Sequence, residues 1–178
     1  MQCLVFFGKK ILTLLGIKLI NIIILGFGQV SRPFIKKVLN DKDINISYIF
    51  TKNKHNENFP FTQKIDDILN TNADVIIEAI TDTELAKKIL LESNVKYYIT
   101  CNKPLIYSMK NDLNINKKIY LTSIVSGKRK ENEFDIPLTN NNIINYSDSD
   151  LFCFRFGGGE ETAQDMYNDL LIIKNNFL

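Results

Sequence analysis

The chain has 178 residues, 45% of them apolar and 24% charged, which is enough apolar chain for one globular domain with a buried core. Its 22 basic and 20 acidic residues leave a net charge of +2, so composition gives no support to a nucleic-acid-binding protein. Because 19 Lys and 21 Asn are scattered along the chain, a single Lys or Asn means little outside a motif.

Residues 1–18 predict an N-terminal extension that precedes the first strand of the domain. The segment is apolar, but Lys9, Lys10 and Lys18 interrupt it, so no run reaches the roughly 18–20 uncharged residues that span a bilayer. A secretory signal peptide would carry its charges before the apolar run. An amphipathic membrane anchor is the alternative interpretation of this segment, and no membrane-spanning helix is expected.

Residues 19–110 alternate between predicted strands and predicted helices. Continuous β-branched runs at 19–25 and 74–80 are typical of strands buried on both faces of a parallel sheet, and 44–50 and 95–100 predict two more strands. Apolar residues at helical spacing predict helices over 30–39, 65–69 and 82–91, and the polar stretch 53–61 predicts a loop. This order predicts an α/β fold, a Rossmann-like doubly wound and mostly parallel sheet that forms a dinucleotide-binding domain.

Residues 111–178 have a different pattern. Three predicted strands, at 119–125, 142–146 and 151–156, follow one another without an intervening helix, which favours antiparallel pairing. Gly157-Gly158-Gly159 then precedes a predicted helix over 160–173. We therefore expect a C-terminal antiparallel strand segment and a closing helix that complete the domain.

A glycine turn follows the first predicted strand and opens the first predicted helix. Its sequence is Gly26-Phe27-Gly28-Gln29-Val30-Ser31. In a dinucleotide-binding turn the first glycine permits the tight bend, and the second lets the backbone approach a pyrophosphate at the helix N-terminus. The pattern predicts cofactor contacts from residues 26–30. A glycine turn in a Rossmann-like domain that binds nothing is the alternative.

The end of the second predicted strand is where such folds read the ribose of the cofactor. An NAD site usually has an acidic residue there, about 20 residues after the glycine turn. Here the segment is Phe50-Thr51-Lys52-Asn53-Lys54, which contains no acid. Thr51 and Lys52 are therefore predicted to contact the cofactor, and Lys52 or Lys54 favours NADP over NAD. The alternative is an ordinary solvated loop.

Two further strand ends carry polar residues. Thr81 follows the third predicted strand, and Asn102 and Lys103 follow the fourth. Thr81 and Asn102 are predicted to contact the cofactor. Asn102 can hydrogen-bond a carboxamide, and Lys103 can face an anionic or carbonyl substrate, although both are also common turn residues. Glu78, within an apolar strand, must be paired or near the rim of the sheet, and His55 is predicted to lie on the surface.

The cysteines and the single histidine argue against a metal site and against a disulfide framework. Cys3, Cys101 and Cys153 are odd in number and widely spaced, so a Cys/His zinc site is not expected. Reduced thiols in a cytoplasmic protein are the simplest interpretation. The basic run Lys128-Arg129-Lys130 predicts a solvated hairpin tip.

Taken in order, these motifs resemble the homoserine dehydrogenase family. The resemblance covers most of residues 20–174 and rests on five segments: 26–30, 74–79, 100–105, 136–144 and 156–170. It implies an NADP- or NAD-binding domain with further cofactor contacts at Gly158 and Thr162, a homodimer formed through the closing segment, and homoserine or aspartate semialdehyde as substrate. It also implies a place in threonine biosynthesis, within the aspartate family of amino acids.

One departure from the family limits what the resemblance implies. The family carries a substrate domain between the segment at 100–105 and the closing strands, and here only residues 106–118 lie between them. That domain holds the family's catalytic lysine and aspartate, so Lys103 is the one candidate catalytic residue that remains. Three functions stay open: an NADP-binding module without full activity, a compact working dehydrogenase, and a non-catalytic dimerising interaction protein.

Overall fold

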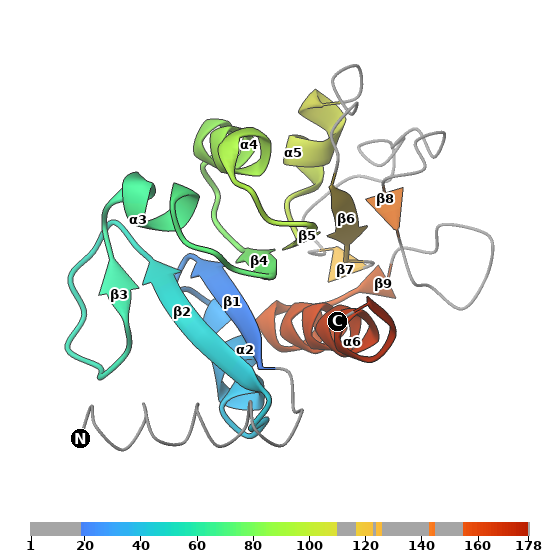
Figure 1. The fold of residues 1–178 in the computed structure, drawn as a ribbon. Helices are drawn as coiled ribbons and strands as arrows, with labels where there is room; N and C mark the ends of the chain where they lie inside the picture. Colours follow the sequence, from blue (N-terminus) through green and yellow to red (C-terminus); the bar gives the residue numbers. More distant parts are fainter. Residues whose placement is uncertain (1–18, 110–116, 123, 126–142, 145–154, 178) are drawn as a thin grey trace.

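The computed structural model describes residues 19–109, 117–122, 124–125, 143–144 and 155–177, and its centre is a parallel β-sheet (Figure 1). Seven strands make this sheet in the order β3-β2-β1-β4-β5-β6-β8, and every neighbouring pair is parallel. Their bounds are β1 (Ile20–Leu25), β2 (Ile44–Phe50), β3 (Phe61–Thr62), β4 (Val75–Glu78), β5 (Tyr97–Thr100), β6 (Lys118–Leu121) and β8 (Ile143–Ile144). The predicted Rossmann-like α/β fold is confirmed.

Helices cover both faces of the sheet, as a doubly wound fold requires. α3 (Ile65–Leu69), α4 (Thr83–Glu92) and α5 (Lys103–Ser108) pack on one face, while α2 (Ser31–Val38) and α6 (Gly159–Phe177) pack on the other (Figure 1). Strand β1 is apolar except at Asn21 because both of its faces are buried. Ile22 and Ile24 join the core beneath α2 and α6, and Ile23 and Leu25 join the opposite core. Burial on both faces removes the alternation that a half-exposed strand shows.

The predicted antiparallel pairing of the C-terminal strands is wrong for the strands that the structure describes. β6 lies parallel to β5, β8 lies parallel to β6, and a separate two-stranded sheet pairs β7 (Ile124–Val125) with β9 (Arg155–Phe156), again in parallel. The prediction took the lack of a helix between these strands as a sign of antiparallel pairing. The chain between β6 and β8, residues 122–142, and between β7 and β9, residues 126–154, is long enough for the crossover that parallel pairing requires.

Three details of the secondary structure were not predicted. Strand β3 begins at Phe61, the last residue of the predicted loop 53–61. Helix α5 has six residues and contains Pro104, too little for an apolar period, and the predicted strand 119–125 is divided between β6 and β7 in different sheets. The predicted extension at 1–18 and the basic run at 128–130 lie outside the described residues.

Candidate functional site

The glycine turn joins β1 to α2 at the centre of the sheet. Gly26 has φ +99°, and a Cβ at this position would lie 2.8 Å from the carbonyl oxygen of Ala79, so only glycine fits. A Cβ on Gly28 would meet no atom within 4 Å, so this residue faces open space. α2 has no acidic residue in its first turn and no side-chain cap at Val30, which leaves the positive end of its dipole uncompensated.

A cleft of about 330 Å³ lies beside this turn, at the carboxyl ends of β1, β2 and β4. Strand order reverses between β1 and β4, and ligands of open α/β sheets bind at such a point. Six of the predicted cofactor residues line this cleft: Gly26, Phe27, Gly28, Thr51, Lys52 and Thr81. Residues from three separate segments of the chain are thus brought together at one edge of the sheet.

An ion pair crosses between two walls of the cleft. Lys52, after β2, places its Nζ 2.8 Å from Oδ2 of Asp82, which follows β4. Oδ1 of Asp82 accepts a hydrogen bond of 3.1 Å from the backbone N–H of Leu85 and so caps α4. The hydrogen bond from Lys52, together with that from Leu85, holds the pKa of the Asp82 carboxyl below its usual range.

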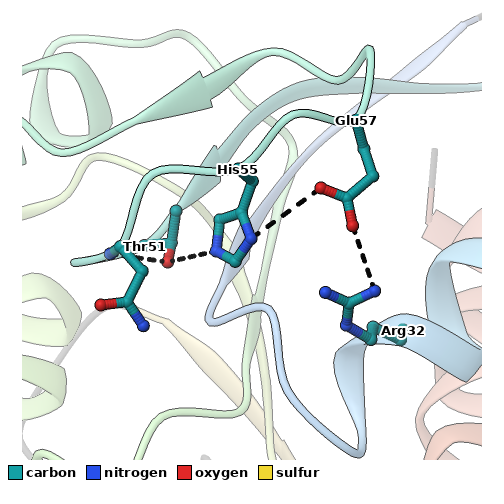
Figure 2. Close-up of polar contacts among 5 residues, drawn as sticks. Arg32, Thr51, His55 and Glu57 are labelled. Carbon is teal, nitrogen blue, oxygen red and sulfur yellow. Dashed lines mark hydrogen bonds and ion pairs between the residues drawn. The ribbon is translucent and has the colours of Figure 1, made fainter.

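His55 lies in the wall of the cleft, so the prediction of a surface position is corrected. Its side chain is 16% exposed, and its ring packs edge-on against Phe27 of the glycine turn, with centroids 4.7 Å apart. Its Nε2 is 3.1 Å from Oγ1 of Thr51 (Figure 2). The ring contact with Phe27 joins residues 28 positions apart, and the polar sequence around His55 gave no sign of it.

Arg32 and Glu57 extend this network around the outside of the turn. The Arg32 guanidinium lies 4.0 Å from the centroid of the Phe27 ring, and its Nη1 is 3.2 Å from Oε1 of Glu57 (Figure 2). Oε2 of Glu57 is in turn 3.9 Å from Nδ1 of His55. These contacts attach the segment after β2 to the first turn of α2, beside the cleft.

A second polar group forms where β4 meets β5. Glu78 is fully buried, its Oε1 accepts a hydrogen bond from the Ile80 N–H at 2.8 Å, and its Oε2 accepts one from Thr100 Oγ1 at 2.5 Å. Burial raises the pKa of Glu78 to about 7, against the lowering effects of these hydrogen bonds, of Asn102 and of the nearby charge of Lys103. The expectation that Glu78 is paired is confirmed.

Asn102 and Lys103 belong to this buried group rather than to the cleft. Oδ1 of Asn102 accepts a hydrogen bond from the Leu105 N–H at 3.1 Å, within the first turn of α5, and its Nδ2 donates to the Ile80 carbonyl at 3.4 Å. Lys103 is 4% exposed, and neither residue is among those that line the cleft. The structure therefore places the candidate catalytic lysine in the protein interior.

The start of α6 packs directly against the glycine turn. A Cβ on Gly159 would lie 2.5 Å from the carbonyl oxygen of Gln29, so glycine allows the two backbones to touch. Gly158 is exposed, and its carbonyl accepts a hydrogen bond of 2.7 Å from Oγ1 of the buried Thr162. Val30 joins the apolar core beneath α2 and α6. Four predicted cofactor residues therefore lie outside the lining of the cleft: Gln29, Val30, Gly158 and Thr162.

The predicted cofactor contacts did not include two titratable residues of the cleft, Asp82 and His55. A signal for Asp82 existed, because an acidic residue that follows a strand and precedes a helix is a strong N-cap candidate. In the part of the chain that the structure describes, no three His, Cys, Asp or Glu side chains group as metal ligands. No helix there is long and apolar enough to cross a membrane.

The parallel sheet, the glycine turn and the cleft define a Rossmann-like α/β domain. Solved structures with partial similarity include S. aureus homoserine dehydrogenase, with 25% identity, a TM-score of 0.43, and 52% of this chain covered. An engineered D-amino acid dehydrogenase bound to NADP+ is 16% identical, with a TM-score of 0.48 and 58% of this chain covered. C. glutamicum DAP dehydrogenase in complex with DAP has 16% identity, a TM-score of 0.45 and the same coverage of this chain.

These alignments span 28%, 36% and 35% of the three solved chains, so this chain matches about a third of each or less. No protein-family model matches the chain, and comparison with curated proteins gave no match.

Proposed function

We propose that the chain binds a nicotinamide dinucleotide in the cleft, with its pyrophosphate at the N-terminus of α2. The observation that carries the proposal is the turn itself: Gly26 adopts a conformation that only glycine tolerates here, and Gly28 leaves open space where a ligand must come close to the backbone. The turn opens onto a cleft at the point where strand order reverses. The pyrophosphate of a dinucleotide binds to backbone N–H groups that no side chain covers and to the positive end of a helix dipole.

The residues present fit such a cofactor. Lys52 supplies a cation at the end of β2, where the ribose of a dinucleotide lies, and no acidic residue competes for the ribose from that strand end. Oγ of Ser31, in the first turn of α2, is buried and makes no hydrogen bond in the structure. NADP is the preferred cofactor in this proposal, with NAD as the alternative. When bound, the cofactor supplies hydride-transfer chemistry, and the protein supplies orientation and charge.

We further propose that the chain is of homoserine dehydrogenase type and lacks the substrate domain of that family. The order of the sequence motifs supports this, and residues 106–118 leave no room for an inserted domain. Little or no activity toward homoserine or aspartate semialdehyde is then expected from this chain by itself. The closing segment, residues 111–178, is proposed to form a homodimer. Sedimentation without cofactor would detect this dimer, and a monomer would contradict it.

A compact working dehydrogenase is the second candidate, and the group around Glu78 is the observation that favours it. Burial raises the pKa of the Glu78 carboxyl to about 7, and the charge of the buried Lys103 acts on it, so Glu78 is able to take up or release a proton near neutral pH. This candidate predicts homoserine-dependent reduction of NADP that Lys103→Ala abolishes. Absence of turnover at high protein concentration would reject it.

A titration that follows NADPH fluorescence tests the proposed binding. The chain contains no Trp, so the signal of the reduced cofactor is read without indole emission. Wild type should bind NADPH, and Gly28→Val should weaken binding roughly tenfold or more, a loss of about 1.4 kcal/mol, because its side chain enters space that only a ligand would fill.

The matched control is Asn72→Val, which is exposed and lies before β4 at the opposite edge of the sheet. It should bind as wild type does, and thermal melts should show all three proteins folded. No binding of either NADPH or NADH to folded wild-type protein at millimolar concentration would reject the proposed function.

A further inference from the structure

The Lys52–Asp82 ion pair is the feature of the cleft that the proposed function does not explain. Its two residues follow different strands, β2 and β4, which lie on either side of β1. Both line the cleft, and their side chains are 68% and 40% exposed. The pair therefore lies across the mouth of the site and contributes little to folding, since exposed ion pairs add about 0–1 kcal/mol.

Asp82 is held in place by its second role. Its Oδ1 caps α4 through the Leu85 N–H, which fixes the carboxylate at the helix end and leaves Oδ2 directed at Lys52. On the other side, the backbone carbonyl of Lys52 accepts a hydrogen bond of 3.0 Å from Nε2 of Gln63. The Asp82 carboxylate is thus fixed by its cap on α4. Lys52 is held at its Nζ by Asp82 and at its backbone carbonyl by Gln63.

The charges around the pair leave Asp82 as the anion that Lys52 contacts. Glu57, the acidic residue of the segment after β2, is paired with Arg32, and Glu84 lies on the exposed first turn of α4. Lys54 is exposed and faces a neighbouring hollow rather than this cleft. The Lys52 ammonium is consequently engaged, but by a group that a stronger anion in the cleft is able to replace.

We propose that Asp82 sets the preference of this site between a ribose 2′-hydroxyl and a ribose 2′-phosphate by acting as an exchangeable counter-ion of Lys52. The inference rests on the proposed dinucleotide function. A 2′-phosphate carries more charge than a carboxylate and draws Lys52 away from Asp82, whereas a 2′-hydroxyl leaves the pair intact. Asp82 is a positioning residue in this scheme, because it acts on the ligand through Lys52.

The test measures dissociation constants for NADPH and NADH with four proteins. These are wild type, Asp82→Asn, Lys52→Met and the double variant. Asn keeps the N-cap at position 82 but loses the charge. The ratio of NADPH to NADH affinity should rise about two- to five-fold in Asp82→Asn, which is the range that an exposed ion pair corresponds to. It should fall in Lys52→Met, which loses the cation.

The double variant distinguishes an effect through Lys52 from a general change of charge. In the Lys52→Met background, Asp82→Asn should leave the ratio at the Lys52→Met value. Glu84→Gln removes the same charge from the same helical turn and should keep the wild-type ratio. Added salt should lower the wild-type preference for NADPH, because the exposed charges are screened.

Two outcomes overturn the inference, and they differ from a failure of the proposed function. If Asp82→Asn leaves the ratio unchanged, or if it raises the ratio equally with and without Lys52, Asp82 does not act through Lys52. Either result requires that both cofactors bind. If neither NADPH nor NADH binds to folded wild-type protein, the proposed function fails, and this inference fails with it.

Discussion

At the scale of single residues, Glu78 shows how the sheet places an acid in the protein interior. The residue ends β4, its carboxylate is hydrogen-bonded by Thr100 and by the Ile80 N–H, and its side chain is fully buried. These bonds connect the ends of β4 and β5 just behind the cleft. Because desolvation outweighs them, the pKa of Glu78 is raised to about 7.

The raised pKa predicts how stability depends on pH. In the unfolded chain the carboxyl ionises near pH 4.5, but in the folded chain only near 7, so between these values the folded state binds more protons. Stability from this group is therefore fully present below about pH 4.5 and is lost as pH rises to about 7, a change of about 3 kcal/mol. Glu78→Gln should remove this slope, as measured by urea unfolding at pH 5 and pH 8.

The effect of Glu78 is the difference between the pH slopes of stability in wild type and Glu78→Gln. Burial raises the pKa of Asp169 to about 8, and this residue contributes a slope of the same sign to both proteins. Glu92→Gln, at the exposed end of α4, is the control for loss of one carboxyl. Parallel pH profiles for wild type and Glu78→Gln would contradict this account of the buried acid.

At the scale of elements, α6 determines where the glycine turn lies. Helix α6 packs beside α2, and the backbone of Gly159 touches the carbonyl of Gln29 in the turn (Figure 1). Near its other end, Nζ of Lys174 is 2.9 Å from Asp41 Oδ1 and 2.9 Å from Asp43 Oδ2, both just before β2. The C-terminal helix is thereby fixed at two points to the first βαβ unit.

Gly159→Ala should therefore destabilise the fold and weaken dinucleotide binding together. The added Cβ meets backbone atoms of Gln29, which cannot rotate away, and overpacking of this kind costs about 1–3 kcal/mol. Gly158→Ala is the matched control, because its Cβ would meet only the end of the Glu161 side chain at 3.3 Å. Equal unfolding free energies and equal NADPH affinities for the two variants would show that the close approach is unimportant.

At the scale of the whole molecule, the cleft lies at the ends of β2, β1 and β4 and does not extend to β5 or β6. Its lining residues follow β1, β2 and β4, and none follows β5 or β6. In a dinucleotide-binding domain the adenosine part of the cofactor lies on the β2 side of the switch point, and the nicotinamide part lies across it. The proposed function therefore predicts that the described cleft binds the adenosine end.

Ligand fragments should reveal this asymmetry in thermal melts. At about 100 times its dissociation constant, a ligand of the native state adds about 2.7 kcal/mol, which raises the melting temperature of a chain this long by about 5–10 °C. We expect 2′,5′-ADP to raise the melting temperature and nicotinamide mononucleotide at the same concentration to raise it much less. Stabilisation by the nicotinamide fragment and none by the adenosine fragment would contradict this placement.

Sequence patterns were sufficient for features that depend on local physics. A β-branched run, a glycine turn and an apolar helix period are each set by neighbouring residues, so β1, the turn at 26–31 and α2 were predicted near their observed bounds. The strand ends that meet at the cleft were predicted as well, since the carboxyl ends of parallel strands share one edge. Strand direction after residue 111 was not, because it depends on the path of the whole chain.

The sequence by itself determined the parallel α/β class, the glycine turn and six of the residues that line the cleft from three strand ends. Only the tertiary structure decided that Asp82 and His55 join them, that Lys103 is buried, and that Gly159 touches the turn. The physical reason is the separation along the sequence over which each kind of interaction acts. Periodicity and turn chemistry act within a few residues, whereas an ion pair such as Lys52–Asp82 forms between residues 30 positions apart only after the sheet has brought two strand ends together.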